Sequence, residues 1–291
     1  MAQEAEPVVV QRRGSGRWIV VGAIVIVLLL AIGYVVGGAA AASGPVSRSD
    51  TALHMTVDDN NAIANMFQDD PFKNVDFGSA NFDAAASKNA LSIVNGEATR
   101  WQDAINKDRA ALQKSHGELN TSVLTLPENS VIDSHRRRVD AGLRAMATAQ
   151  KALTLIRNQV AFLLPLMDVI GNFQAVGKAA DANDIGSMQS SLAATQTSLQ
   201  KTISLARAAS VPPVLTSALN LLQKTVSDMQ ALVAAVQSRN AAAINASLST
   251  INADGVALDA VDSSAIDKAE NALIQPLSDA YDRDMKIVAG S

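Results

Sequence analysis

The feature that most constrains this chain is an apolar run close to its amino terminus. Residues 18–36 form 19 consecutive positions without a charged residue or a proline. A helix of that length spans roughly 28 Å, close to the thickness of the hydrocarbon core of a bilayer. Trp18 and Tyr34 lie towards its two ends, where aromatic membrane anchors are common. The run therefore predicts a transmembrane helix whose partner is the lipid bilayer, followed by a small-residue extension to position 42.

Basic residues flank this predicted helix on one side only. Arg12, Arg13 and Arg17 precede it, whereas the next basic residue on the far side is Arg48. By the positive-inside rule, residues 1–17 are expected to be a cytoplasmic leader and the rest of the chain to be extracytoplasmic. The expected localisation is the cell membrane, with a single pass and a cytoplasmic amino terminus.

Small residues after the apolar run leave a second interpretation open. The alanines at 39–42 satisfy the small-x-small rule of signal peptidases, so the same chain could be secreted after cleavage near Ala41 or Ala42. Against cleavage, the apolar run is longer than a secretory signal needs, and Glu4 and Glu6 stand in the leader. A retained signal anchor is the favoured interpretation.

Composition indicates helices outside the membrane and narrows the range of partners. The chain is 48% hydrophobic but only 3% aromatic, so Ala, Leu, Val and Ile dominate, and these residues suit helix–helix packing. A net charge of −4 argues against a nucleic-acid partner. The absence of cysteine excludes disulfides and thiolate metal sites. An alanine-rich, cysteine-free, exported chain is typical of bacterial proteins.

The remaining sequence predicts an all-α fold in two parts. Residues 43–80 are expected to be a linker that could hold a short helix over 50–68, and residues 81–291 an extracytoplasmic, antiparallel helical bundle with coiled-coil-like packing. The predicted inward positions of the short helix are Leu53, Val57, Ala64 and Phe67.

Steps of three and four between apolar positions carry the prediction of a bundle. In the first long segment these positions are Leu91, Val94, Ala98, Trp101, Ile105, Asp108, Leu112, Ser115 and Leu119; in the second they are Ile132, His135, Val139, Gly142, Met146, Ala149, Leu153, Ile156, Val160, Leu163, Met167 and Ile170. A loop with Pro127 joins the two segments, so an antiparallel hairpin is expected. Pro165 is expected to kink or break the second helix.

Four further helices are expected towards the carboxyl terminus. They begin after Asp184, at Pro213, after Asn240 and near Asp267, and the last contains Pro276. The helix after Asn240 is expected to face inward with Ile244, Leu248, Ile251 and Leu258. A faint repeat with an offset of 56 residues relates the first and third of these helix starts (184 and 240), with chance similarity among Ala, Ser and Leu as the alternative.

Motifs for catalysis or cofactor binding are missing from the sequence. Carboxylate-bridged iron, zinc-protease and phosphate-loop patterns are absent. Ser198 and Lys201 fit a Ser-x-x-Lys pattern, but its companion motifs are missing. We therefore expect no enzyme activity and no cofactor.

Two small groups of residues are the candidates for a site. His116, Asp133 and His135 would approach one end of the bundle and could contribute to a metal site, although separate solvated side chains are the favoured interpretation. Asp108 occupies an inward position and needs a partner. Arg138 is within reach if the hairpin pairs back from its loop, so a buried ion pair is expected, with a ligand-gripping site as the alternative.

These observations favour a non-enzymatic protein that is anchored in the membrane and displays a helical bundle for structural or partner-binding work. The partner would be an extracytoplasmic protein or a second copy of the chain. The alternative is a bundle that binds a small ligand, as sensor domains do. A one-chain sensor normally needs a second membrane helix, and residues 43–291 contain no second uncharged run of that length.

Overall fold

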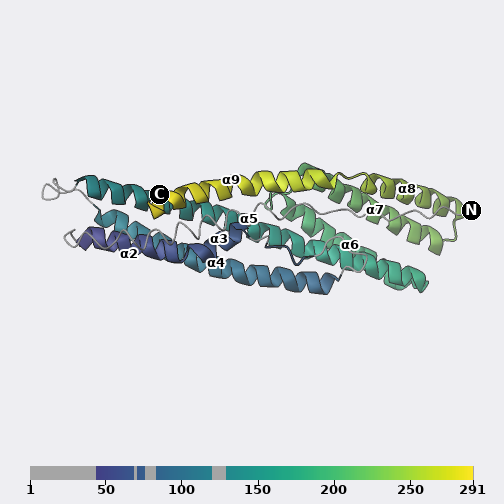
Figure 1. Cartoon of the computed structure of the whole chain (residues 1–291). Helices are drawn as coiled ribbons and strands as arrows, with labels where there is room; N and C mark the ends of the chain where they lie inside the picture. Colours follow the sequence, from purple (N-terminus) through teal and green to yellow (C-terminus); the bar gives the residue numbers. More distant parts are fainter. Residues whose placement is uncertain (1–43, 69–70, 76–82, 120–128, 291) are drawn as a thin grey trace, which may run out of the picture.

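The computed structural model describes residues 44–68, 71–75, 83–119 and 129–290, and all regular elements in these ranges are helices (Figure 1). They are α2 (Gly44–Asp58), α3 (Asn60–Gln68), α4 (Ala84–Glu118), α5 (Asn129–Asp181), α6 (Ile185–Ala206), α7 (Pro213–Gln237), α8 (Ala241–Asp259) and α9 (Ser263–Ala289). The prediction of an all-α fold is confirmed. The predicted transmembrane helix over 18–36, including Trp18 and Tyr34, lies outside the described residues, as do Arg12, Arg13 and Arg17.

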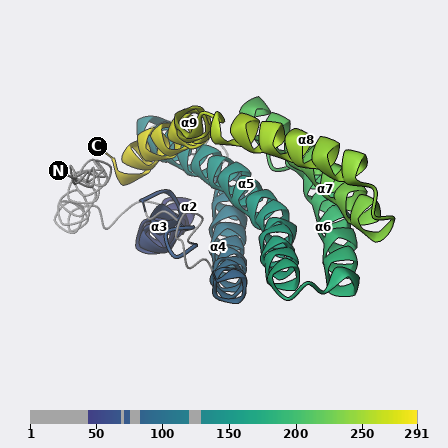
Figure 2. The ribbon, with the colours of Figure 1, turned by 90° about the vertical axis from the view of Figure 1, so that its right-hand side faces the viewer.

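The molecule is elongated because α5 runs along most of it and serves two hydrophobic cores. With 53 residues, α5 is about 80 Å long. Its first part packs with α2, α3, α4 and α9 around one core, and its last part packs with α6 and α7 around the other. Consecutive helices from α4 to α8 alternate in direction along this axis, and the end-on view places α5 between α4 and α6 (Figures 1 and 2).

The three-four spacing of apolar residues predicted the first core correctly. All nine inward positions expected between 91 and 119 are buried. Along α5 nine of the twelve expected positions are buried, and the other three are half-buried. Gly142 allows α4 and α5 to approach closely, because a Cβ atom there would lie 2.9 Å from a methyl group of Leu112. The predicted α4–α5 hairpin is therefore present.

Residues 43–80, expected to be a linker with a possible short helix over 50–68, contain two helices, α2 and α3. Gly44 already begins α2, with Pro45 in the first turn, where a missing backbone N–H costs nothing. The four inward residues predicted for the short helix are indeed buried, but they belong to α2 and α3, which pack into the first core. Two polar contacts fasten this region: Lys107 Nζ lies 2.8 Å from Asp59 Oδ2, and the Tyr281 hydroxyl donates to Asn60 Oδ1 at 2.8 Å.

The expected break at Pro165 does not occur, since α5 continues through it. A proline removes one backbone hydrogen bond, and the packing of α5 against its neighbours on both sides of this point outweighs that loss. The last helix also begins earlier than expected, at Ser263, because the Asp262 carboxylate caps the backbone N–H of Ser264. Within the described residues, α5 contains the one stretch that is long and apolar enough to cross a bilayer, but its contacts with α2, α4, α6 and α9 make it the central helix of the bundle.

The faint repeat corresponds to a backbone repeat at two corners. Four backbone hydrogen bonds at the first corner have counterparts 56 residues later, and all eight are 2.9–3.1 Å long. At the first corner they are Ala182 N to Lys178 O, Asn183 N to Ala180 O, Asp184 N to Ala179 O and Met188 N to Asp184 O. At the second corner they are Ser238 N to Ala234 O, Arg239 N to Val236 O, Asn240 N to Ala235 O and Ile244 N to Asn240 O. Asn183 and Arg239 both adopt positive φ, 52° and 53°. The α5–α6 and α7–α8 corners are therefore built in the same way. Three of the four bonds and a positive φ, 55° at Ser210, also occur at the α6–α7 corner, so the backbone pattern is a general way of ending a helix in this chain.

Candidate functional site

The three residues considered for a metal site do not come together. His116 Nε2 lies 3.2 Å from Asp140 Oδ1, whereas His135 Nε2 lies 3.0 Å from Asp50 Oδ1 on α2. Asp133 is exposed and lies 3.7 Å from Arg136. No group of three His, Asp or Glu side chains within the described part of the chain is arranged to hold a metal ion. His116 and His135 instead each join two helices through a single carboxylate.

The expected ion pair between Asp108 and Arg138 is absent, and this prediction was wrong. Arg138 Nε donates to the backbone oxygen of Val288 at 2.9 Å, so it ties α5 to the end of α9. Asp108 is completely buried, and neither of its carboxylate oxygens meets a hydrogen-bond donor among the described residues. The side chain was correctly placed in the core by its spacing, but its neighbourhood is different from the one predicted.

Asp108 faces the corner between α2 and α3 instead of the start of α5. Burial, together with the negative charge of Asp59, raises the pKa of its carboxyl to about 7, while Lys107 opposes the increase. The neighbouring Asp59 carboxyl also favours the protonated form of Asp108, because a protonated carboxyl can donate to a carboxylate beside it whereas two carboxylates repel. Burial raises the pKa of the Tyr281 hydroxyl, and the nearby charge of Asp108 adds to that increase. This cluster lies in the core and is a structural feature.

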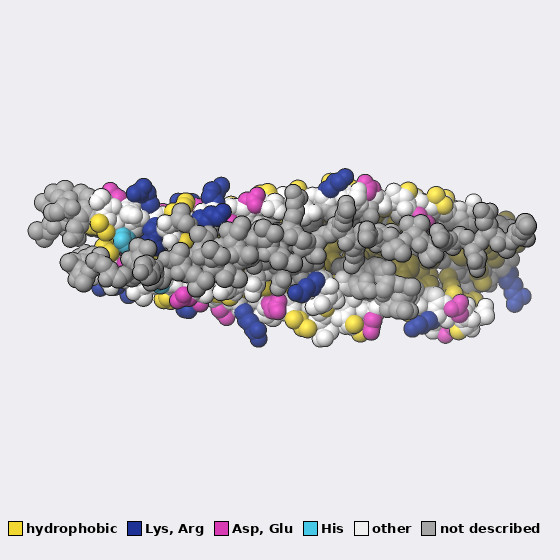
Figure 3. Space-filling model, viewed as in Figure 1, with side chains coloured by type: hydrophobic (Ala, Val, Ile, Leu, Met, Phe, Trp, Pro, Cys, Tyr) yellow, Lys and Arg dark blue, Asp and Glu magenta, His cyan; other side chains and the backbone are white. Residues whose placement is uncertain are grey.

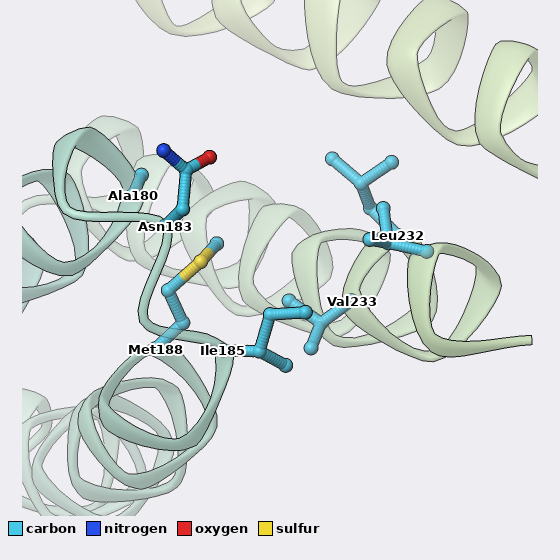
Figure 4. Close-up of a pocket in the computed structure, with 7 residues that line it drawn as sticks. Ala180, Asn183, Ile185, Met188, Leu232 and Val233 are labelled. Atoms are coloured by element: carbon cyan, nitrogen blue, oxygen red, sulfur yellow. The ribbon is translucent and has the colours of Figure 1, made fainter. Parts of the chain in front are cut away.

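An open apolar pocket lies where α5 ends and α6 begins, beside the end of α7. It has a volume of about 250 Å³ and is lined by Ala180, Asn183, Ile185, Met188, Leu232, Val233 and Val236. The lining comes from the end of α5, the α5–α6 corner, the start of α6 and the end of α7. Figure 4 shows Met188 extending toward the gap between the corner and α7. Gln189 Nε2 donates to Gln237 Oε1 at 3.1 Å and holds these two helix ends together.

The pocket suits binding and not catalysis. Its lining offers thioether, alkyl and methyl groups with one amide, Asn183, and none of its seven residues is an acid, a base or a nucleophile. Val236, one of the lining residues, is 41% exposed, so the apolar surface of the pocket continues onto the outside of the molecule. Sequence reasoning assigned Ile185 and Met188 to a helix but did not find the pocket, because the pocket depends on how closely α7 approaches the preceding corner.

The comparisons with known proteins add no relative. No protein-family model, no curated protein and no solved structure matches this chain. The geometry that bears on function is that of an elongated all-α molecule whose described pocket lies at one end.

Proposed function

We propose that this protein is a non-enzymatic, single-pass membrane protein that holds a helical rod outside the membrane and binds a protein partner at the end of the rod that is far from the bilayer. The apolar run over 18–36 serves as the anchor, and the arginines before it keep the amino terminus in the cytoplasm. Residue 44 begins the rod directly, without the long linker expected from the sequence.

The position of the two ends of the rod supports this proposal most strongly. The start of α2, the start of α5 and the end of α9 lie together, since His135 pairs with Asp50 and Arg138 bonds to Val288. The apolar pocket lies at the opposite end of α5, separated from these contacts by most of the helix, whose full length is about 80 Å. An anchor before residue 44 therefore leaves the pocket at the end that is farther from its attachment (Figure 1).

A small apolar ligand is the second candidate occupant, and the pocket is the observation that favours it. Its volume of about 250 Å³ is slightly below that of typical ligand sites, roughly 300–1,000 Å³, and it is open to solvent. An open, shallow apolar pocket fits a side chain from a partner better than a buried small molecule. Protein binding is therefore the leading proposal.

A reporter enzyme that is active only outside the cytoplasm tests the arrangement when it is fused after Ser291. The fusion should be active, and the intact protein should stay in membranes washed with alkaline carbonate. A silent reporter on a stably expressed fusion would contradict the orientation. Recovery of a soluble protein that begins near Ala42 would instead show that the run over 18–36 is a cleaved signal.

A further inference from the structure

The turn between α2 and α3 consists of a single residue, Asp59. Its backbone N–H donates to Met55 O at 2.8 Å at the end of α2, and its carbonyl oxygen accepts from the Ala62 N–H at 3.1 Å at the start of α3. α3 itself has nine residues, and a helix this short is at best marginally stable on its own in water. Figure 2 shows α2 and α3 together at one side of the bundle, beside α4. α3 therefore depends on packing against the rest of the first core.

α4 and α9 provide polar and aromatic contacts that fasten this region. Lys107 of α4 pairs with Asp59, with 2.8 Å between Nζ and Oδ2, and the Tyr281 hydroxyl of α9 donates to Asn60 Oδ1 at 2.8 Å. The ring of Tyr281 also stacks on Phe67, with the two ring centroids 5.0 Å apart. We call Asp59 and α3 the latch, because these contacts hold them against helices that are distant in the sequence.

Asp108 of α4 lies beneath the latch, beside Asp59. Figure 3 shows Lys, Arg, Asp and Glu side chains on the outside of the molecule, where water solvates them, whereas Asp108 is completely buried. No hydrogen-bond donor among the described residues reaches either oxygen of its carboxyl group. An ionised carboxylate at this place would have neither water nor a donor, so the closed arrangement accommodates Asp108 as the neutral acid.

The charged groups around Asp108 do not neutralise it. Asp59 adds negative charge from the latch, and Lys107, the cation that acts on Asp108, is already paired with Asp59. From α9 the Tyr281 hydroxyl faces Asp108, and Asp282 acts on that hydroxyl and not on Asp108. Within its described residues, α5 contributes no charged group to this site. Burial and Asp59 therefore keep the pKa of Asp108 at about 7, and its charge changes near neutral pH.

We propose that the latch is pH-sensitive: it is closed while Asp108 is neutral, and ionisation of Asp108 releases Asp59 and α3 from α4 and α9. Two carboxylates side by side in a buried site repel each other, and an ionised carboxylate needs water. Both costs disappear when the latch moves away, because water then reaches both groups, and the proton of Asp108 goes to the solvent. Released α3 loses the packing that stabilises it, while α4, α5 and α9 still share the rest of the first core. The latch does not depend on the proposed membrane anchor.

Acid should close the latch and alkali should open it. Asp108 binds its proton more tightly when it is buried than when the released latch exposes it to water, so a rising pH favours the released arrangement. The ratio of released to closed protein should increase about tenfold for each pH unit between about 4, the ordinary pKa of an aspartate, and about 7, the pKa of the buried carboxyl. Above that range the ratio should level off.

Labelling of single cysteines tests this inference, because the natural chain has no cysteine. Ala64→Cys places a thiol at a buried position of α3, and Ala145→Cys places one at a fully buried position of α5 in the first core. The full-length proteins react with a methanethiosulfonate reagent at pH 5 and at pH 8. Each rate is divided by the rate for Ala110→Cys, an exposed position on α4, which removes the effect of pH on the thiol itself.

The relative labelling rate at position 64 should rise by roughly tenfold or more from pH 5 to pH 8, whereas the rate at position 145 should stay low at both. Adding Asp108→Asn to Ala64→Cys should remove the rise, because the amide is neutral at every pH.

Three results would overturn the latch. They are an unchanged rate at position 64, an equal rise at positions 64 and 145, which would show general loosening of the core, and a rise at position 64 that persists with Asp108→Asn. Positions 64 and 145 are compared in proteins that keep Asp108, so this comparison is decisive even if Asp108→Asn does not fold.

Discussion

Asp108 carries an acid into the first core at a place where no cation neutralises it. The side chain is completely buried and faces Asp59, so its carboxyl keeps a proton near neutral pH, with a pKa of about 7. Spacing alone predicted that position 108 is buried. It did not predict the neighbour, because Asp59 belongs to the α2–α3 corner, which sequence reasoning had placed in a linker. Partners that come from distant parts of the chain leave no local signal at either residue.

Replacing this acid by its amide should make the protein more stable at high pH. The pKa of Asp108 is higher in the folded than in the unfolded protein, so the folded state binds more protons, and stability falls as pH rises from about 4 to about 7. Asp108→Asn removes that loss. A tenfold change in an acid constant corresponds to about 1.4 kcal/mol, so the variant should gain up to a few kcal/mol above pH 7 and little below pH 4.

Urea unfolding of both proteins at pH 4 and pH 8 measures this difference. Asp103→Asn, at an exposed position on the same helix, is the control and should leave the pH dependence unchanged. A variant at position 108 that is less stable than the natural protein at pH 8 would show that the ionised carboxylate finds a stabilising partner.

At the scale of helices, the sequence predicts well where a helix occurs and less well which face of that helix is buried. The spacing of apolar residues located α4 and α5 because each of them buries a continuous seam. In α8 the spacing was right for Ile244, Ile251 and Leu258, which are half-buried. It was wrong for Leu248, which is exposed, and it missed Asp254, the one buried residue of this helix. Spacing shows which residues share a face, but which face is covered depends on where the following helix goes, and α9 goes to the other core.

The two equivalent corners should respond differently to the loss of their caps. Asp184 accepts a hydrogen bond from the Ser187 N–H at 3.0 Å, and Asn240 accepts one from the Ala243 N–H at 3.1 Å. Substituting either by alanine removes a helix cap worth roughly 1 kcal/mol. α6 is held by both α5 and α7, whereas α8 is held mainly by α7, so Asn240→Ala should expose α8 to local unfolding while Asp184→Ala leaves α6 protected.

Hydrogen exchange read by mass spectrometry on the two full-length variants distinguishes these effects. Faster exchange confined to residues 241–259 is expected for Asn240→Ala. Equal loss of protection in α6 and α8 would contradict the view that α8 is the least supported helix.

For the whole molecule, the length of α5 determines the shape. An all-α fold with antiparallel hairpins was predictable, but the elongated arrangement with two cores was not, because a break at Pro165 would have folded the chain into a shorter bundle. Since α5 continues through Pro165, it separates the start of α2 from the apolar pocket by most of its length of about 80 Å. In our proposal this distance is what the anchored protein provides: a binding end held away from the bilayer.

The claim that residues 18–36 retain the rod outside the membrane can be tested by labelling a single cysteine in intact cells. Full-length protein carrying Ala110→Cys is treated with a maleimide that does not cross membranes, and the membranes are then washed with carbonate. We predict a labelled protein of full length, 291 residues or that length without the initiator methionine, that stays in the washed membranes. Labelling only after the cells are lysed, or a labelled protein that is released and lacks the first 41 or 42 residues, would contradict the account.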